Sequence, residues 1–295
     1  AWAFVAIGLA SVSARAQETN AETNADKITE EPNAESQMID RTWLYADDAR
    51  VPEPLHVVAT TSLSYTDTGA SPTRADSPFG NSYNAFAANT AQPGAMMAFG
   101  GEVGLVSHLS VIALGEAGAG EGAAVNAGAL AGLRLQLLPI VWKNTHLVMS
   151  AGYLREAWEG PVHDDDGKWY PGSPRGDNGA WGQLAFSGDV RRLRIATTIH
   201  GEHIFADGKD DADVMVNAGA SYRLVGDFRA GVEYVGQDLE ETFDPGAEGG
   251  ARHFVGPVAS LQLLQHRLSI VAGPAIGLSS TSPRLLGRLA VAYGF

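Results

Sequence analysis

The chain has 295 residues, of which 45% are hydrophobic and only 18% are charged, with 35 glycines, no cysteine and a formal net charge of −14. Soluble domains usually carry about 25% charged residues and about 7% glycine, so this composition is unusually apolar and poor in charge. The lack of cysteine excludes disulfides, thiol nucleophiles, lipid-modified cysteine and cysteine-ligated zinc or iron–sulfur sites. The negative charge argues against nucleic acid, which requires Lys and Arg to neutralise its phosphates.

Residues 1–16 are predicted to form a secretory signal peptide. The first 12 residues are apolar, and Ala14-Arg15-Ala16 then provides a small-x-small cleavage pattern before Gln17. The apolar run is too short for a membrane-spanning helix, which needs about 20 residues. We therefore expect the chain to be exported.

Residues 17–54 are predicted to form an acidic, largely disordered periplasmic tail. This stretch carries ten acidic and three basic residues, a net charge of −7, and few apolar ones. Such a segment cannot bury enough apolar surface to offset the entropy of ordering, at least to about Ile39. Trp43-Leu44-Tyr45 interrupts the polar stretch. It is interpreted either as part of a docking segment, for a partner or for the mouth of the folded body, or as stray apolar residues in a tether.

From residue 55 to residue 295 apolar residues recur at every second position, which is the period of a β-strand. In 125–137, for example, the odd-numbered positions are all apolar, whereas the even-numbered ones include Asn126, Arg134 and Gln136. Most of the predicted strands are long enough for a tilted membrane strand of about 9–11 residues. Twelve strands are predicted, near 55–66, 94–107, 109–118, 123–138, 145–157, 179–188, 192–205, 212–225, 228–239, 252–264, 267–279 and 284–295.

The predicted connections alternate between tight and long, which indicates an up-and-down antiparallel barrel. Gly176-Asp177-Asn178-Gly179 is interpreted as a turn that leads into the next strand. The tight links are Ser107–His108, Pro139–Asn144, Asp189–Arg191, Gly226–Asp227 and Gln265–His266. The other connections are 67–93, 119–122, 158–178, 206–211, 240–251 and 280–283.

One parity of the strands is apolar, while the other carries charges of both signs, as expected for a lipid face and a lumen. A soluble barrel or sandwich shows the same alternation, so that interpretation stays open. Aromatic residues near strand ends are interpreted as an interfacial girdle, namely Tyr153, Trp181, Phe205, Tyr222, Phe228, Tyr234, Tyr293 and Phe295. The residues predicted to line the lumen are Glu102, Arg134, Arg194, His200, Glu202, Arg223, Arg229, Glu233 and Arg288.

The leader, the twelve alternating segments and the last strand, which ends in Tyr293-Gly294-Phe295, resemble a Gram-negative outer-membrane β-barrel. The resemblance covers about residues 55–295 and implies an all-β, closed antiparallel transmembrane barrel in the outer membrane. It also implies that Tyr293 and Phe295 form the signal for the barrel-assembly machinery. Periplasmic chaperones, outer-membrane lipid and lipopolysaccharide are the expected partners, and the oligomeric state stays open.

His200-Gly201-Glu202-His203 is the densest group of potential metal ligands or catalytic residues. On a strand His200 and Glu202 share one face and His203 lies on the other, so no closed zinc site is expected. His203 lies on the lipid-facing parity, where some barrel enzymes place a catalytic histidine, but no serine adjoins it. No catalytic residue, metal site or cofactor is therefore predicted, and a lipid-modifying enzyme remains the least favoured alternative.

The longer connections carry fifteen acidic residues and four basic ones, so they would attract cations and repel anions. Asp164-Asp165-Asp166 in 158–178 lacks the pattern of an EF-hand, although weak binding of divalent cations by such loops stays open. The leading functional hypothesis is a narrow porin-like channel for small solutes, since twelve strands enclose only a narrow lumen. The alternative is a non-conducting barrel with a plugged lumen that serves a structural or surface-interaction role.

Overall fold

The computed structural model describes residues 49–67, 94–120, 125–137, 144–158, 162–163, 169–170, 173–205, 213–237, 239, 251–279 and 282–295. The chain divides into two compact units, residues 1–34 and 35–295, and all described residues belong to the second. The predicted signal peptide and Trp43-Leu44-Tyr45 lie outside the described residues, as do Asp164-Asp165-Asp166 and most of the long connections. No helix in the described part is long and apolar enough to cross a membrane.

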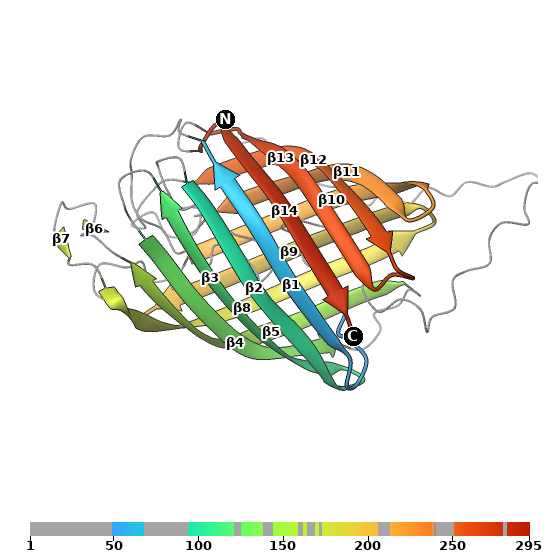
Figure 1. The fold of residues 1–295 in the computed structure, drawn as a ribbon, viewed down its shortest axis with the longest axis horizontal. Helices are drawn as coiled ribbons and strands as arrows, with labels where there is room; N and C mark the ends of the chain where they lie inside the picture. The colour runs from blue at the N-terminus through green and yellow to red at the C-terminus, as the bar shows by residue number, and fades with distance from the viewer. Residues whose placement is uncertain are drawn as a thin grey trace, which may run out of the picture. The chain divides into compact units, whose positions relative to one another are not determined.

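Twelve antiparallel strands in the described part of the chain form a closed barrel in chain order (Figure 1). The barrel closes between the first and last strands, from Val58 opposite Gly294 to Thr66 opposite Leu286. The predicted fold class, an all-β closed antiparallel barrel of twelve strands, is confirmed. The strands are β1 (Val57–Thr66), β2 (Gly94–Val106), β3 (Leu109–Gly120), β4 (Val125–Leu137), β5 (Thr145–Trp158), β8 (Ser173–Val190), β9 (Leu193–Ile204), β10 (Asp213–Val225), β11 (Phe228–Gln237), β12 (Arg252–Leu263), β13 (Leu268–Gly277) and β14 (Leu285–Gly294).

Two short strands that the sequence did not indicate, β6 (Val162–His163) and β7 (Trp169–Tyr170), form a separate hairpin between β5 and β8. We call the barrel end that carries the β2–β3, β8–β9, β10–β11 and β12–β13 turns the short-turn end, and the opposite end the long-loop end. Phe295 lies at the short-turn end, where its N–H donates to the Val57 carbonyl at 2.9 Å.

The predicted turn at Gly176-Asp177-Asn178-Gly179 is wrong, because β8 begins at Ser173 and contains all four residues. Asp177 pairs with Glu156 of β5, and the β5–β8 register shifts between Glu156 and Trp158. Gly176 has a φ of +78°, which glycine adopts without the strain imposed by a side chain. Glycine and Asn/Asp signal both turns and strand irregularities, and here pairing with β5 continues the strand through them.

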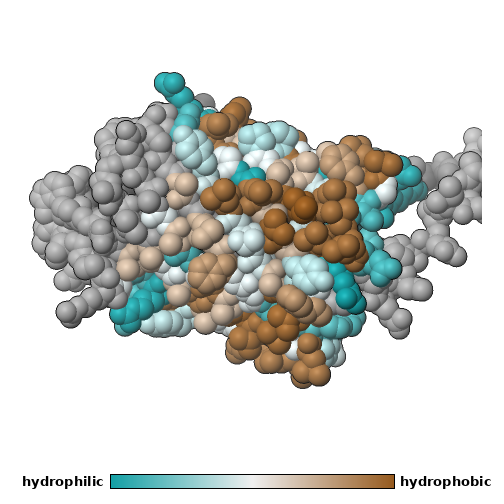
Figure 2. Space-filling model, viewed as in Figure 1, coloured by the Kyte–Doolittle hydropathy of each residue, from teal (hydrophilic) through white to brown (hydrophobic). Residues whose placement is uncertain are grey.

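The outward side chains of the barrel are apolar and exposed, whereas the inward ones are buried. Leu63, Phe99 and Ile199 point outward and are exposed, while their strand neighbours Ser62, Ala98 and His200 are buried. Figure 2 shows hydrophobic side chains gathered over the visible face of the barrel. An apolar surface that follows strand after strand is typical of contact with lipid.

Candidate lumenal site

Nine residues were predicted to line the lumen. Eight of them have buried side chains on the inner face of the barrel. The ninth, Arg223, is half-buried at the short-turn end, where it pairs in register with Arg229. The eight buried side chains are Glu102, Arg134, Arg194, His200, Glu202, Arg229, Glu233 and Arg288.

A first charged network joins β2, β3 and β4 toward the short-turn end. Arg134 Nη1 donates to Glu102 Oε2 at 3.2 Å, and the Ser110 hydroxyl donates to Glu102 Oε1. All three side chains are buried. Both carboxylate oxygens of Glu102 are thus hydrogen-bonded, as a buried charge requires.

A second network at the short-turn end gathers three described arginines around Asp189. Arg194 donates to both carboxylate oxygens, with Nε–Oδ1 and Nη2–Oδ2 distances of 2.8 and 2.7 Å. Arg50 Nη2 donates to Oδ2 at 3.0 Å, and Arg229 Nη2 lies 3.8 Å from Oδ1. One carboxylate therefore interacts with guanidinium groups from β9, β11 and the segment before β1.

The segment that precedes β1 packs against the inner wall. Ala49 N–H donates to the Ser187 hydroxyl oxygen at 3.2 Å, and Val51 N–H donates to Gln136 Oε1 at 3.4 Å. Ala49 also belongs to an apolar cluster with Val148 and Ala185. The end of the acidic stretch 17–54 is therefore bound inside the short-turn end of the barrel.

We expect Arg50→Ala to release this segment while leaving the barrel folded. The loss of a hydrogen bond between charged groups, roughly 1.5 kcal/mol, should make the amides of Ala49 and Val51 exchange about ten times faster. Hydrogen exchange followed by mass spectrometry measures this rate. Arg284→Ala, which alters an exposed arginine beyond the long-loop end of β13, is the control. Unchanged exchange at Ala49 and Val51 would show that the ion pair does not hold the segment.

Three glutamates, Glu116, Glu156 and Glu202, point inward from β3, β5 and β9 and are buried. Glu116 is 4% exposed, and neither of its carboxylate oxygens has a hydrogen-bond partner among the described residues. Its charge interacts with those of Glu202, Glu156 and Arg288. Carboxylates from three separate strands thus face one region of the lumen.

A stacked aromatic pair adjoins these carboxylates. His200 Nε2 lies 3.3 Å from Glu202 Oε2, and the His200 and Trp181 rings stack with centroids 5.9 Å apart. Trp181 also pairs in register with Glu202 across β8 and β9. The predicted place of Trp181 in an outer aromatic girdle is wrong, because its side chain is buried on the inner face.

Two glycines make room for the Trp181 indole on the inner wall. A Cβ on Gly132 would lie 2.6 Å from Trp181 Cζ2, and one on Gly152 would lie 2.8 Å from Trp181 Nε1. Because both positions lack a side chain, the indole can lie against β4 and β5. We call the buried apolar cluster around it the Trp181 patch; its members are Ala98, Ile112, Leu114, Leu130, Leu154, Trp181 and Ile204.

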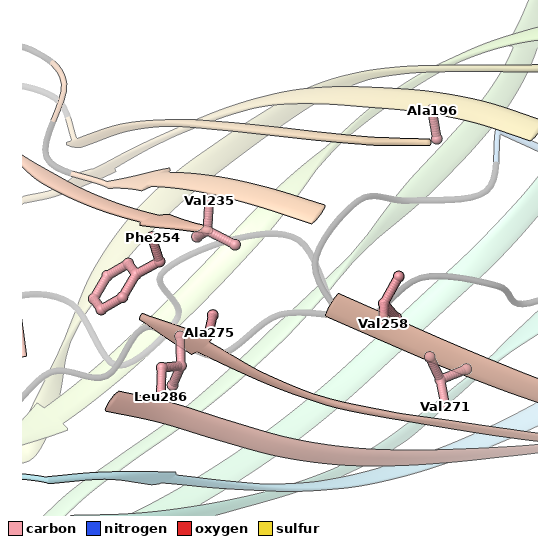
Figure 3. Packing of buried hydrophobic residues seen from close by; sticks show 7 residues of the cluster. All are labelled: Ala196, Val235, Phe254, Val258, Val271, Ala275 and Leu286. Atoms are coloured by element: carbon pink, nitrogen blue, oxygen red, sulfur yellow. The ribbon is translucent and has the colours of Figure 1, made fainter. Parts of the chain in front are cut away.

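A second apolar cluster lies on the inner side of β9 and β11–β14, and Figure 3 shows its seven side chains. Its members are Ala196, Val235, Phe254, Val258, Val271, Ala275 and Leu286. Since β9 and β11 are not neighbours in the sheet, side chains from separate parts of the wall meet inside the barrel. The inner face therefore alternates between ionic networks and apolar patches.

The His203 side chain lies on the outer parity and contacts Phe205 edge to face, with ring centroids 5.0 Å apart. Its Nδ1 has no hydrogen-bond partner among the described residues. Within these residues no three His, Asp or Glu side chains are arranged to hold a metal ion. Tyr293 and Phe295, predicted to form the assembly signal, contact each other edge to face with centroids 4.8 Å apart.

Comparison with known proteins finds no matching family model and no matching curated protein. Among solved structures, an outer-membrane channel from Pseudomonas putida F1 matches with a TM-score of 0.54 at 9% identity, covering 86% of this chain and 100% of that chain. The KdgM porin matches with a TM-score of 0.43 at 8% identity, covering 81% of this chain and 99% of that one. The translocator domain of the autotransporter NalP from Neisseria meningitidis gives 0.44 at 13% identity, with 84% and 90% covered.

Of these likenesses only the first has a TM-score above 0.5, and it extends to the fold alone. The first shows that the chain shares its barrel fold with an outer-membrane channel. Function has to be argued from the inner face itself, because the fold hosts many activities.

Proposed function

We propose that this chain is an outer-membrane β-barrel that forms a narrow channel for small solutes, with the short-turn end and the N-terminal tail in the periplasm. The apolar outer face supports placement in a membrane, because a closed barrel leaves no unpaired strand edge in lipid. Outer-membrane lipid, lipopolysaccharide, periplasmic chaperones and the assembly machinery are the partners that this placement requires.

The observation that carries the channel proposal is the Glu116 carboxylate. A buried carboxyl group whose oxygens have no hydrogen-bond partner is costly, so a purely structural interior would pair it or replace it with an apolar residue. Such a group is expected in a channel, where water or a passing solute donates the hydrogen bonds that the protein does not. The lumen is narrow, since inward side chains such as Arg134, Arg194 and His200 are almost fully covered. Solutes that pass must therefore be small and must displace side chains.

A second candidate, a non-conducting barrel, is favoured by the contacts at the short-turn end. Ala49, Arg50 and Val51 lie against the inner wall there. The Asp189 carboxylate that binds Arg50 also contacts Arg194 of β9 and Arg229 of β11. If these contacts persist in the membrane, they close the lumen at that end.

Recordings from planar lipid bilayers separate the two candidates. We expect refolded protein to give discrete current steps that are smaller than those of wide porins, because the lumen of a twelve-stranded barrel is narrow. Heat-modifiable migration on a detergent gel verifies that the sample is folded, and heat-denatured protein is the control. Folded protein that gives no current would favour the non-conducting barrel.

A further inference from the structure

We infer that Glu116, Glu156, Glu202 and the Trp181 patch form a binding site for a small organic cation, an ammonium group attached to an apolar or aromatic body. The inference rests on the proposed channel function and deepens it, because it names the class of solute. The site lies on the inner faces of β2–β5, β8 and β9, which carry all of its residues.

The charges in this part of the lumen call for a cation. Glu116 interacts with two further carboxylates, those of Glu156 and Glu202, against one guanidinium, that of Arg288. Neither oxygen of Glu116 has a hydrogen-bond partner among the described residues, and the same holds for Glu202 Oε1. Three of the other inner arginines, Arg134, Arg194 and Arg229, contact the carboxylates of Glu102 and Asp189 toward the short-turn end. A bound cation would supply both the missing charge and the missing donors.

The register of the strands leaves space between the carboxylates. Glu116 of β3 lies opposite Gly128 of β4, which lies opposite Glu156 of β5. Because glycine has no side chain, nothing from β4 stands between the two glutamates at this level. An ammonium group has three donors and can bridge such separated acceptors.

The Trp181 patch provides the second half of the site. Leu114 precedes Glu116 by two residues on the inner face of β3, Leu154 precedes Glu156 in the same way on β5, and both belong to the patch. Trp181 faces the same lumen and pairs in register with Glu202. An aromatic face beside carboxylates favours a cation through the ring quadrupole, and the leucines favour its apolar body. The carboxylates would repel an anion of the same shape.

Titration calorimetry of the full, refolded protein with benzylammonium tests the site. Benzyl alcohol and benzoate, which share the aromatic ring but lack the positive charge, are the matched ligands. We expect heat of binding for benzylammonium alone, and affinity lowered about tenfold or more by Glu116→Gln, since a hydrogen bond between charged groups is lost. Trp181→Phe should weaken binding without changing the charge. Glu53→Gln, which alters an exposed carboxyl near the short-turn end, is the control and should bind as the parent does.

Equal affinity of the parent protein and Glu116→Gln for benzylammonium would overturn the inference, and it is the result expected if Glu116 simply holds a proton. Equal affinity for benzyl alcohol would also overturn it, because an apolar patch alone would then suffice. The channel proposal and the binding site fail on different results. Binding of benzylammonium without a channel current would refute the channel but not the site. A channel current without binding would refute the site but not the channel. Gel migration verifies the fold of every variant.

Discussion

Asp189→Asn is expected to lower the free energy of unfolding of the barrel by about 3 kcal/mol. The carboxylate of Asp189 interacts with Arg194, Arg229 and Arg50, and its removal leaves three positive charges close together. The Arg194 side chain is only 2% exposed, so water cannot replace the lost partner. Removing one partner of a buried ion pair typically costs about 3–5 kcal/mol, and the 18% exposure of Asp189 places the effect at the lower end. Urea unfolding in detergent micelles measures the difference.

Asp227→Asn is the matched control, because Asp227 lies at the same end of the barrel in the β10–β11 turn. Its side chain is 46% exposed, and His266 Nε2 lies 3.9 Å from its Oδ1. A surface pair of this kind contributes less than about 1 kcal/mol. If the two substitutions had equal effects, the Asp189 network would not stabilise the barrel.

Gly152→Ala is expected to destabilise the barrel by about 3 kcal/mol or more and to reduce the yield of folded protein, because extra volume in a packed interior forces the backbone to move. A Cβ at this position would collide with the Ala131 carbonyl oxygen and would lie 2.6 Å from Gly132 Cα, both backbone atoms of β4. It would also lie 2.8 Å from Trp181 Nε1, so the indole would have to leave its place. The folded fraction on a detergent gel and the urea midpoint report the effect.

Gly182→Ala in the neighbouring strand β8 provides the comparison. Gly182 pairs in register with Ala151, the residue before Gly152, and the nearest atom to a Cβ there is Ser150 O at 3.9 Å. Ala at this position should fold with near-parental stability. Normal folding of Gly152→Ala, or an equal loss for Gly182→Ala, would contradict the close approach of β4 and β5.

The strands and the inward residues were predictable from the sequence because alternation is a local property. Each strand shows which residues share a face, so Glu102, Arg134 and Glu202 fall on the charged parity without knowledge of their partners. The membrane interpretation then turns that parity inward. The prediction of a turn at residues 176–179 was wrong because glycine and asparagine signal strand irregularities as well as turns. Trp181 was misplaced because an aromatic near a strand end suits an outer girdle, although its parity is that of the buried Gln183.

The partners of these residues were not predictable from local patterns. Asp189 belongs to a predicted tight link and Arg50 to a predicted disordered tail, yet they meet inside the barrel across 139 residues of chain. Glu116 and Glu156 share the charged parity, but nothing local shows that Gly128 lies between them. The docking interpretation rested on Trp43-Leu44-Tyr45, which lie outside the described residues, so the contacts of residues 49–51 leave it a prediction.

The closure of the barrel has a consequence for how this chain folds. The β1–β14 pairing joins residues that are 220 or more positions apart in the chain, from Thr66 opposite Leu286 to Val58 opposite Gly294. Pairings with such large sequence separation form slowly, because the entropy of closing a long loop is lost before the contacts form. Until they form, β1 and β14 are both open edges with unpaired backbone groups, which can pair with another chain. The last step of folding is therefore also the step at which aggregation competes most strongly.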